Sequence, residues 1–298
     1  MKNKVVWHNK LYLALFYIFT RTTPRFWQVW QNRLISPIIF YAWKRLRCML
    51  QNNIAVVLNR NPSDGLVRRT ACRTVVNYGL YLIDYTQLNR LRDYMLPEQR
   101  GARYMRQVLD EGNGAILITP HLGNWELGGV VFAQRGHPIY ALTLMDSQEN
   151  VQAFRDNMRS HLGIHTVHID PENNGTILKL AMLLRQNKVI AMLGDRYEGG
   201  KKVPVSFFGK TVLYPAGAAA LALATGAPIV PAFTVLQPDG RYLSWMEAPI
   251  RVKRVAGQKT MELLTEKTQE IAAVFEKAVA RYPDQWYHFF PYWERYEA

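Results

Sequence analysis

The 298-residue sequence has little cysteine, no acidic residue near its start and no long uninterrupted apolar run. Its two cysteines, Cys48 and Cys72, can form neither a disulfide framework nor a zinc or redox motif, and this usage is typical of a reducing compartment. The first acidic residue is Asp64. Two uncharged apolar runs, 11–20 and 34–43, are each about half the roughly 20 residues that a spanning helix requires. A span built from both runs stays an alternative.

Several catalytic motifs are also absent. The tripeptide Gly209-Lys210-Thr211 resembles the end of a phosphate-binding loop, but Pro204 stands where that motif needs glycine. The Gly-x-Ser-x-Gly motif of serine hydrolases does not occur. No cluster of histidine with cysteine or glutamate has zinc-ligand spacing. We therefore expect no metal site and no bound cofactor.

The formal net charge of +14 predicts a nucleic acid, an anionic membrane or an anionic substrate as partner. Over residues 1–45, lysine and arginine alternate with aromatic and aliphatic side chains, which favours a lipid interface over RNA. We expect one or two helices that lie on a membrane or insert shallowly, with Pro24 and Pro37 breaking their continuity. A buried helical hairpin is the alternative. Residues 46–298 form the second predicted domain.

From residue 115 onward, short apolar runs rich in β-branched residues alternate with helical patterns. This alternation predicts an α/β fold with a mixed, largely parallel sheet flanked by helices. The predicted strands are 115–119, 138–143, 164–169, 189–193 and 229–236, with 242–247 as an edge strand. The predicted helices are 44–60, 66–83, 103–109, 124–135, 149–162, 175–187, 215–225 and 259–281.

His121 and Glu126 lie in an unusual segment at the end of a predicted strand. On one continuous helix they would be about 140° apart and would not meet, so a turn must separate them. Gly123 and Asn124 readily adopt one. We interpret His121 as a general base and Glu126 as the carboxylate that orients it. The imidazole takes a proton from a hydroxyl, and the carboxylate holds the imidazole in the required tautomer. A structural histidine at a strand end is the alternative.

A second His-x4-acid spacing, His165 and Asp170, has no glycine turn between its members. It reads as an alternating strand, on which these two side chains face opposite sides. We therefore do not expect it to be catalytic.

The segment 120–126, PHLGNWE, resembles the His-x4-Asp/Glu signature of bacterial lipid A biosynthesis acyltransferases and their lysophospholipid acyltransferase relatives, which include phosphatidylinositol mannoside acyltransferases. Further stretches resemble this family in the same order, and the resemblance covers about residue 40 to the end. They are 159–164 (RSHLGI), 194–196 (GDR), 204–210 (PVSFFGK) followed by 214–217 and 227–231, and 283–286 (PDQW) with Trp293.

The resemblance implies a lysophospholipid acyltransferase-like fold and an O-acyltransferase. The acyl donor would be an acyl-carrier-protein or coenzyme A thioester, and the acceptor a hydroxyl of a membrane glycolipid of the lipid A precursor type. His121 would be the general base and Glu126 its partner, without an acyl-enzyme. The resemblance also implies a membrane-anchoring N-terminus at the cytoplasmic face of the bacterial inner membrane, and no nucleic acid partner.

Other acceptors stay open. A lysophospholipid or a mannosylated phosphoinositide is the main alternative, and a non-catalytic basic protein that binds membranes or RNA is the remote one. The tail 287–296 is aromatic and mixed in charge, where lipid A enzymes often carry a basic run. That departure concerns the acceptor and not the chemistry.

The resemblance also points to residues that would bind substrate. Arg159 and Arg196 would clamp phosphates or carboxylates through the guanidinium fork, or else be solvated arginines. Asp195 would orient Arg196 or cap a strand end. The remaining candidates are Asn124 and Gly209, Phe207 and Phe208 as an acyl slot or as core, the amides of residues 123–125 as oxyanion donors, and Lys201, Lys202 and Lys210 for an anionic headgroup or the carrier protein.

Overall fold

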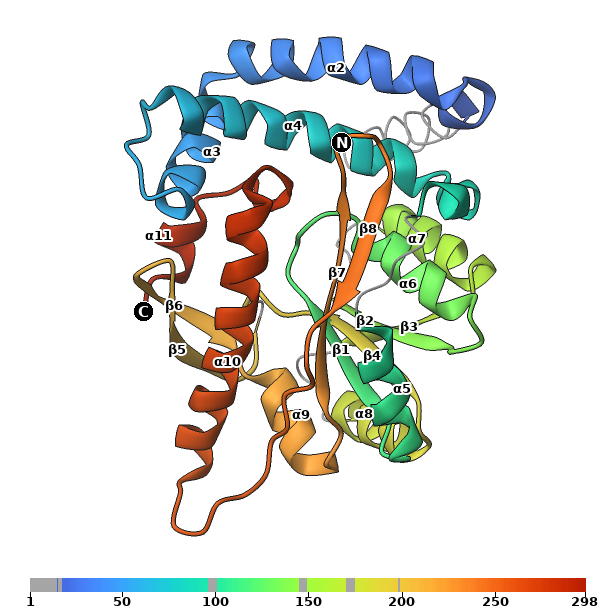
Figure 1. Cartoon of the computed structure of the whole chain (residues 1–298), viewed down its shortest axis with the longest axis vertical. Coiled ribbons are helices and arrows are strands. Elements are labelled where there is room, and N and C mark those ends of the chain that lie inside the picture. The colour runs from blue at the N-terminus through green and yellow to red at the C-terminus, as the bar shows by residue number, and fades with distance from the viewer. Residues whose placement is uncertain (1–14, 16–17, 96–100, 145–148, 170–174, 198) are drawn as a thin grey trace.

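A computed structural model describes residues 15, 18–95, 101–144, 149–169, 175–197 and 199–298 (Figure 1). The helices are α2 (Arg25–Ala42), α3 (Lys44–Val57), α4 (Gly65–Tyr85), α5 (Ala102–Asp110), α6 (Trp125–Ala133), α7 (Glu149–His161), α8 (Gly175–Arg185), α9 (Gly217–Thr225), α10 (Thr260–Arg281) and α11 (Tyr292–Tyr296). Two short 3₁₀ helices are η1 (Leu88–Tyr94) and η2 (Pro283–Gln285). The strands are β1 (Ala115–Thr119), β2 (Ile139–Leu144), β3 (Ile164–Ile169), β4 (Val189–Leu193), β5 (Lys202–Phe207), β6 (Lys210–Pro215), β7 (Ile229–Leu236) and β8 (Tyr242–Met246).

The predicted α/β fold with a mixed, mostly parallel sheet is confirmed. Six strands pair in the order β3-β2-β4-β1-β7-β8, and every neighbouring pair is parallel except β7 with β8. The strand expected at an edge is β8, at one end of this order. In the centre, β1 lies between β4 and β7, although 74 residues separate the first residue of β1 from that of β4, Ala115 from Val189. This order decides which strand ends become neighbours.

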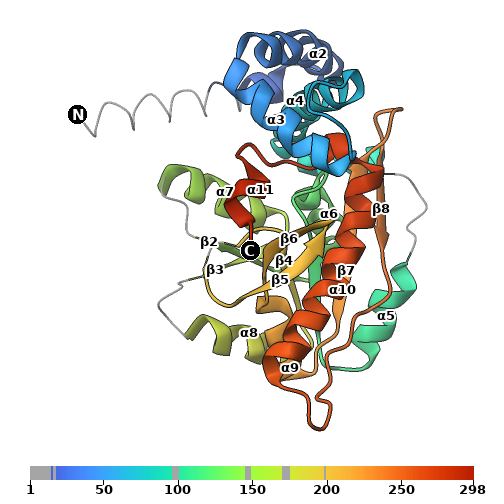
Figure 2. The same ribbon diagram turned by 90° about the vertical axis from the view of Figure 1, so that its left-hand side faces the viewer.

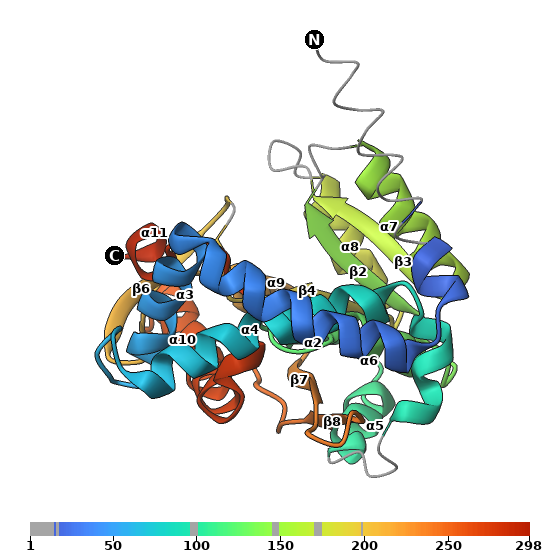
Figure 3. The same cartoon turned by 90° about the horizontal axis from the view of Figure 1, so that it is seen from above.

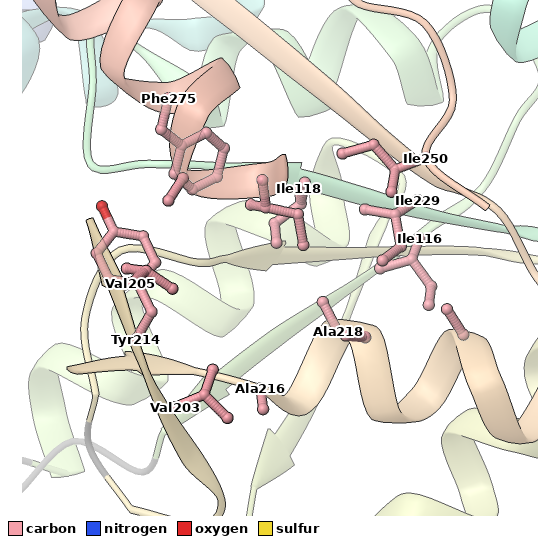
Figure 4. Packing of buried hydrophobic residues seen from close by; sticks show 14 of the residues in the cluster. Ile116, Ile118, Val203, Val205, Tyr214, Ala216, Ala218, Ile229, Ile250 and Phe275 are labelled. Atoms are coloured by element: carbon pink, nitrogen blue, oxygen red, sulfur yellow. The ribbon is translucent and has the colours of Figure 1, made fainter. Parts of the chain in front are cut away.

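Helices cover both faces of the sheet because alternate side chains of each central strand point to opposite faces. Ile116 and Ile118 of β1 belong to the core beneath α8, α9 and α10, where they gather with Ile229 and Phe275 (Figure 4). Ala115 of the same strand belongs to the core beneath α5 and α6. Continuous apolar runs therefore appear in the sequence, as expected for strands buried on both sides.

The segment 202–215 differs from the prediction, because no strand was expected there and the structure has a hairpin of β5 and β6 outside the main sheet. Its two-residue turn consists of Phe208 (φ 51°) and Gly209 (φ 72°). Two consecutive residues at positive φ match the twist of the flanking strands. Phenylalanine rarely adopts this conformation, so the turn carried no recognisable sequence signal.

The helices α2, α3 and α4 form a separate layer at the top of the molecule, with α2 outermost (Figures 1 and 3). Pro24 precedes the first residue of α2, as expected of a break. The expected break at Pro37 is wrong, because α2 continues through it. A proline inside a helix removes one backbone hydrogen bond, and α2 tolerates that loss. The apolar run 11–20 lies mostly outside the described residues.

The side of α2 that faces the protein is polar along most of its length, and near the C-terminal end Phe40 is buried among apolar residues of α3 and α4. Gln28 and Ser36 are buried, and the Asn32 side chain donates to the Val76 carbonyl of α4 at 2.8 Å. Large apolar side chains of α2 are exposed instead: Phe26, Trp27, Trp30, Leu34, Ile35, Ile38, Ile39 and Tyr41. We call these eight residues the outer face of α2. Within the described part of the chain, no helix is both long and apolar enough to cross a membrane.

Candidate active site

His121 lies just beyond the C-terminal end of β1, in a turn that the C-terminal tail holds in place. Gly123 has φ +64°, and a Cβ atom there would lie 2.1 Å from the Thr234 carbonyl oxygen of β7, so the expected glycine turn is confirmed. The Gly123 amide donates to the Gln285 carbonyl at 2.9 Å, and the Tyr287 amide donates to the His121 carbonyl at 2.8 Å. The stretch after η2 thus runs antiparallel to the turn and fixes its backbone.

Asp195 is the acidic partner of His121 in the structure. The His121 Nδ1 lies 2.6 Å from Asp195 Oδ1, and the His121 amide donates to Oδ2 at 3.0 Å. The pairing of β1 with β4 brings them together, since Thr119 lies opposite Leu193 and each functional residue follows two positions later. The Asp195 side chain is fully buried. Burial opposes its ionisation, but the interactions with His121 and His288 outweigh burial and hold the Asp195 pKa well below its ordinary value.

The tail supplies further contacts to Asp195. Trp286 Nε1 donates to Oδ2 at 3.1 Å, and His288 Nε2 lies 2.9 Å from the same oxygen. The Tyr292 hydroxyl donates to the Asp195 carbonyl at 3.0 Å. Figure 2 shows this end of the chain returning beside β5 and β6. Asp195 is therefore the centre of a buried hydrogen-bond network.

Glu126 contacts a different residue from the one expected. It lies in the first turn of α6, as predicted, but its carboxylate forms a two-bond ion pair with the guanidinium of Arg159 from α7. Burial opposes the Arg159 charge, and the Glu126 carboxylate more than offsets this, so the Arg159 pKa is raised. The position beside His121 Nδ1 that the sequence assigned to Glu126 is taken by Asp195.

An apolar cavity opens between α6 and the sheet. Its walls include Leu117, Val131, Ile139, Ala191, Met192 and Phe233, and its polar lining includes Thr119, Glu126 and Arg159. Trp125 belongs to the cavity wall, and its ring centroid lies 5.4 Å from that of His121. The candidate base therefore adjoins a cavity that suits an apolar ligand.

Several other residues predicted to bind substrate have structural roles instead. Asn124 caps α6, because its side chain accepts from the Leu127 amide. The amides of Gly123 and Asn124 donate to main-chain carbonyls, which removes two of the three expected oxyanion donors. Phe207 is fully buried in the core, against Tyr214 and Trp286, and does not line the cavity.

Arg196 points toward the tail, since its Nη2 donates to the Tyr287 carbonyl at 2.6 Å. Asp195 therefore orients His121 and not Arg196. Phe208, Gly209 and Lys210 line a second cleft, beside α3 and Trp293, while Lys201 and Lys202 are exposed.

The second His-x4-acid spacing does not form a comparable pair. His165 is exposed on β3 and stacks on Tyr140, with ring centroids 4.8 Å apart. Asp170 lies outside the described residues. Over the part of the chain that the structure describes, no three His, Cys, Asp or Glu side chains are grouped as a metal site.

Sequence reasoning missed His288 and misassigned Asp195. A signal for Asp195 was present, because His121 and Asp195 each follow a buried strand by two residues. The carboxyl ends of neighbouring parallel strands share one edge of a sheet. His288 had only its place just after the PDQW stretch as a signal, among residues that read as an aromatic tail.

Comparisons with known proteins give matches along most of the chain. The family model described as bacterial lipid A biosynthesis acyltransferase matches residues 3–295. The phosphatidylinositol mannoside acyltransferase of Mycolicibacterium smegmatis is 28% identical over 251 residues, which cover 82% of this chain and 78% of that protein. The protein of the same name from Mycobacterium tuberculosis H37Rv is 26% identical over 249 residues, covering 82% of this chain and 76% of its own.

Proposed function

The chain belongs to the bacterial lipid A biosynthesis acyltransferase family, and on that premise we propose that it moves a fatty acyl chain from a thioester to a hydroxyl of a membrane glycolipid. The donor is an acyl-carrier-protein or coenzyme A thioester. We favour an acceptor of the lipid A precursor type. A mannosylated phosphoinositide is the alternative that the names of the mycobacterial relatives support, and a lysophospholipid is another.

The observation that carries the proposal is the buried Asp195 carboxylate against Nδ1 of a histidine beside an apolar cavity. A carboxylate at Nδ1 fixes the tautomer in which Nδ1 carries the proton and Nε2 carries the lone pair that can act as a base. In the proposed reaction, Nε2 of His121 takes the proton from the acceptor hydroxyl, and that oxygen attacks the thioester carbonyl carbon. Asp195 stabilises the imidazolium that forms.

Collapse of the tetrahedral intermediate breaks the carbon–sulfur bond and leaves the new ester. The departing thiolate takes the proton from the His121 imidazolium, so the enzyme returns to its starting state without an acyl-enzyme. The oxyanion needs hydrogen-bond donors. Of the amides expected from the sequence, that of Trp125, at the first position of α6, is the one we assign to this task.

The apolar cavity is where we place the acyl chain, because an extended hydrocarbon chain leaves water there and contacts Leu117, Val131 and Met192. Glu126 and Arg159 form the charged part of its lining. Glu126 holds Arg159 through two hydrogen bonds, so the guanidinium is kept beside the cavity as a neutral pair and not as a free cation.

We propose that the protein docks on the cytoplasmic side of the bacterial inner membrane, and the outer face of α2 supports contact with a membrane as such. In water, eight large apolar side chains on one helix would be unfavourable at about 25 cal/mol per Å² of exposed apolar surface. Tryptophan and tyrosine are typical of the lipid headgroup region. Arg21, Arg33 and Lys44 flank or interrupt this face and suit anionic lipids.

The test is acyl transfer from both thioester donors to a panel of lipid acceptors, with His121→Ala beside the wild type. His165→Ala serves as the matched control, because that exposed histidine lies outside the site. Transfer to one acceptor that His121→Ala abolishes and His165→Ala retains would support the proposal and identify the acceptor. Full activity of His121→Ala, with the variant correctly folded, would overturn it.

A further inference from the structure

The C-terminal tail contributes a histidine that the reaction proposed above does not yet use. His288 is 1% exposed and lies between a carboxylate and a guanidinium. Its Nε2 lies 2.9 Å from Asp195 Oδ2, and its Nδ1 lies 3.1 Å from Arg196 Nε. Arg196 also packs over the ring of Phe290, with its Cζ 5.2 Å from the centroid. These contacts form a chain from Arg196 through His288 and Asp195 to His121.

The chemistry of Arg196 decides the tautomer of His288. A guanidinium keeps its protons and can only donate, so the Nδ1 of His288 must accept with its lone pair. The proton of the neutral ring is then on Nε2, where it faces Asp195. Burial lowers the His288 pKa to about 3 against the opposing effect of Asp195, and the charge of Arg196 adds to the lowering. The ring is therefore neutral near pH 7.

We propose that His288 is a positioning residue for acyl transfer: Arg196 fixes its tautomer, and its Nε2–H holds Asp195 so that Oδ1 faces His121 Nδ1. The inference rests on the proposed function, because His288 acts through His121. Oδ2 accepts from the His121 amide, from Trp286 and from His288. With Oδ2 occupied in this way, the carboxylate cannot rotate without losing hydrogen bonds, and Oδ1 stays directed at the imidazole.

The same arrangement predicts an effect on the pH dependence. The charged and titratable groups that face the two imidazoles are Asp195 and Arg196 after β4 and Tyr292 on α11. A carboxylate that accepts fewer hydrogen bonds holds an imidazolium more tightly. Loss of the His288 donor should therefore move the acid limb of the kcat/KM profile to higher pH, by roughly half to one unit.

Three variants separate this role from ordinary packing. His288→Phe keeps a buried ring and removes the donor to Asp195, and we expect kcat to fall about ten- to a hundredfold, as for a lost hydrogen bond to a charge. His288→Gln keeps a neutral N–H donor at the distance of Nε2, and we expect most of the activity and an unshifted acid limb. Arg196→Met leaves His288 in place but frees its tautomer, and an intermediate activity is expected. His165→Gln is the matched control.

A readout that does not depend on activity comes from the ¹⁵N spectrum of the histidine side chains in the full-length protein in detergent micelles, with His288→Gln assigning the signal. We expect His288 to be neutral, with its proton on Nε2, from about pH 5 to 8. In Arg196→Met the other tautomer or the charged form should appear. Wild-type His288 with its proton on Nδ1 would overturn the proposal, whether or not the variants fold.

The kinetic outcomes also separate this inference from the proposed function. If His121→Ala abolishes transfer while His288→Phe keeps the wild-type kcat and pH profile, the role of His288 is wrong and the acyl transfer stands. If His121→Ala is fully active, the proposed function fails and the positioning role fails with it. Equal losses in His288→Gln and His288→Phe, with unshifted profiles, would indicate packing alone and would overturn the positioning role.

Discussion

The sheet and the N-terminal layer of helices distribute their side chains in opposite ways. In the sheet, Ile118 is 2% exposed, and the polar site residues gather where the central strands end. In α2, Ile38 is 66% exposed, whereas Gln28 is 1% exposed and bonds to main-chain carbonyls and to Gln87. The sheet buries its apolar side chains away from water, as in a water-soluble protein. The helix α2 instead presents apolar side chains on its outer side.

The difference shows what each region relies on. The sheet obtains its stability from apolar burial, which removes side chains such as Phe275 from water. The helix α2 is attached by one buried aromatic residue, Phe40, and otherwise by polar contacts, which contribute less per residue after desolvation. Arg25 connects α2 to the rest of the protein, because it donates twice to the buried Asp84 of α4. Asp84 also accepts from the Tyr242 hydroxyl of β8. The two regions therefore respond differently to mutation.

The largest effect is expected at Asp195, just beyond the carboxyl end of the central strand β4. Asp195→Asn preserves the shape of the side chain but cannot stabilise the imidazolium of His121, so kcat should fall about 10³- to 10⁴-fold. The double variant with His121→Ala should lose little more than either single one, because the pair acts as a unit. Steady-state transfer kinetics measure both. Glu126→Gln is the comparison, and a larger loss there than in Asp195→Asn would restore the pair that the sequence suggested.

The next largest effect is expected at the ion pair of Arg25 and Asp84, which connects α2 to α4. Arg25→Met leaves the Asp84 carboxylate buried without its cation, and the free energy of unfolding should fall by about 3–5 kcal/mol. Adding Asp84→Leu removes the stranded charge and should regain most of that loss. Denaturant unfolding measures both variants. A loss below about 1 kcal/mol for Arg25→Met would mean that α2 is held by its other contacts.

The contrast itself is sharpened by a matched pair of isoleucines. Ile118→Ala in the sheet should lower the free energy of unfolding by about 2–5 kcal/mol, through lost burial and the cavity that remains. Ile38→Ala on the outer face of α2 should change it by less than about 0.5 kcal/mol. The same Ile38→Ala variant should bind anionic lipid vesicles more weakly. Equal vesicle binding would remove the support for a lipid-facing α2.

The last prediction concerns pH and the buried His288. Because its pKa is lowered to about 3 in the folded protein, the unfolded chain binds the extra proton first as the pH falls. Stability from this group is present above the unfolded value of about 6.5 and is lost toward pH 3, at up to about 1.4 kcal/mol per pH unit. Asp195, whose pKa is also lowered, loses its contribution in the same direction at lower pH. His288→Gln should flatten the slope between about pH 6.5 and 4 in denaturant titrations.

Much of the sheet was predictable because its signals are local. Runs such as 115–119 and 189–193 coincide with β1 and β4, since continuous β-branched and apolar residues suit strands buried on both faces. The hairpin 202–215 was missed because a turn with Phe208 at positive φ contradicts local preference. The path of α2 through Pro37 was missed for a related reason, as packing against α4 outweighs a local rule.

The sequence by itself determined most strands and helices of the main sheet, that His121 follows a strand and that a glycine turn comes after it. Those features depend on neighbouring residues and on side-chain periodicity. Only the tertiary structure decided that β4 pairs with β1, and therefore that Asp195 and not Glu126 meets His121 Nδ1. It also decided that His288, 93 residues beyond Asp195, completes the network. Strand order and the docking of the tail depend on how whole faces pack, which local spacing does not specify.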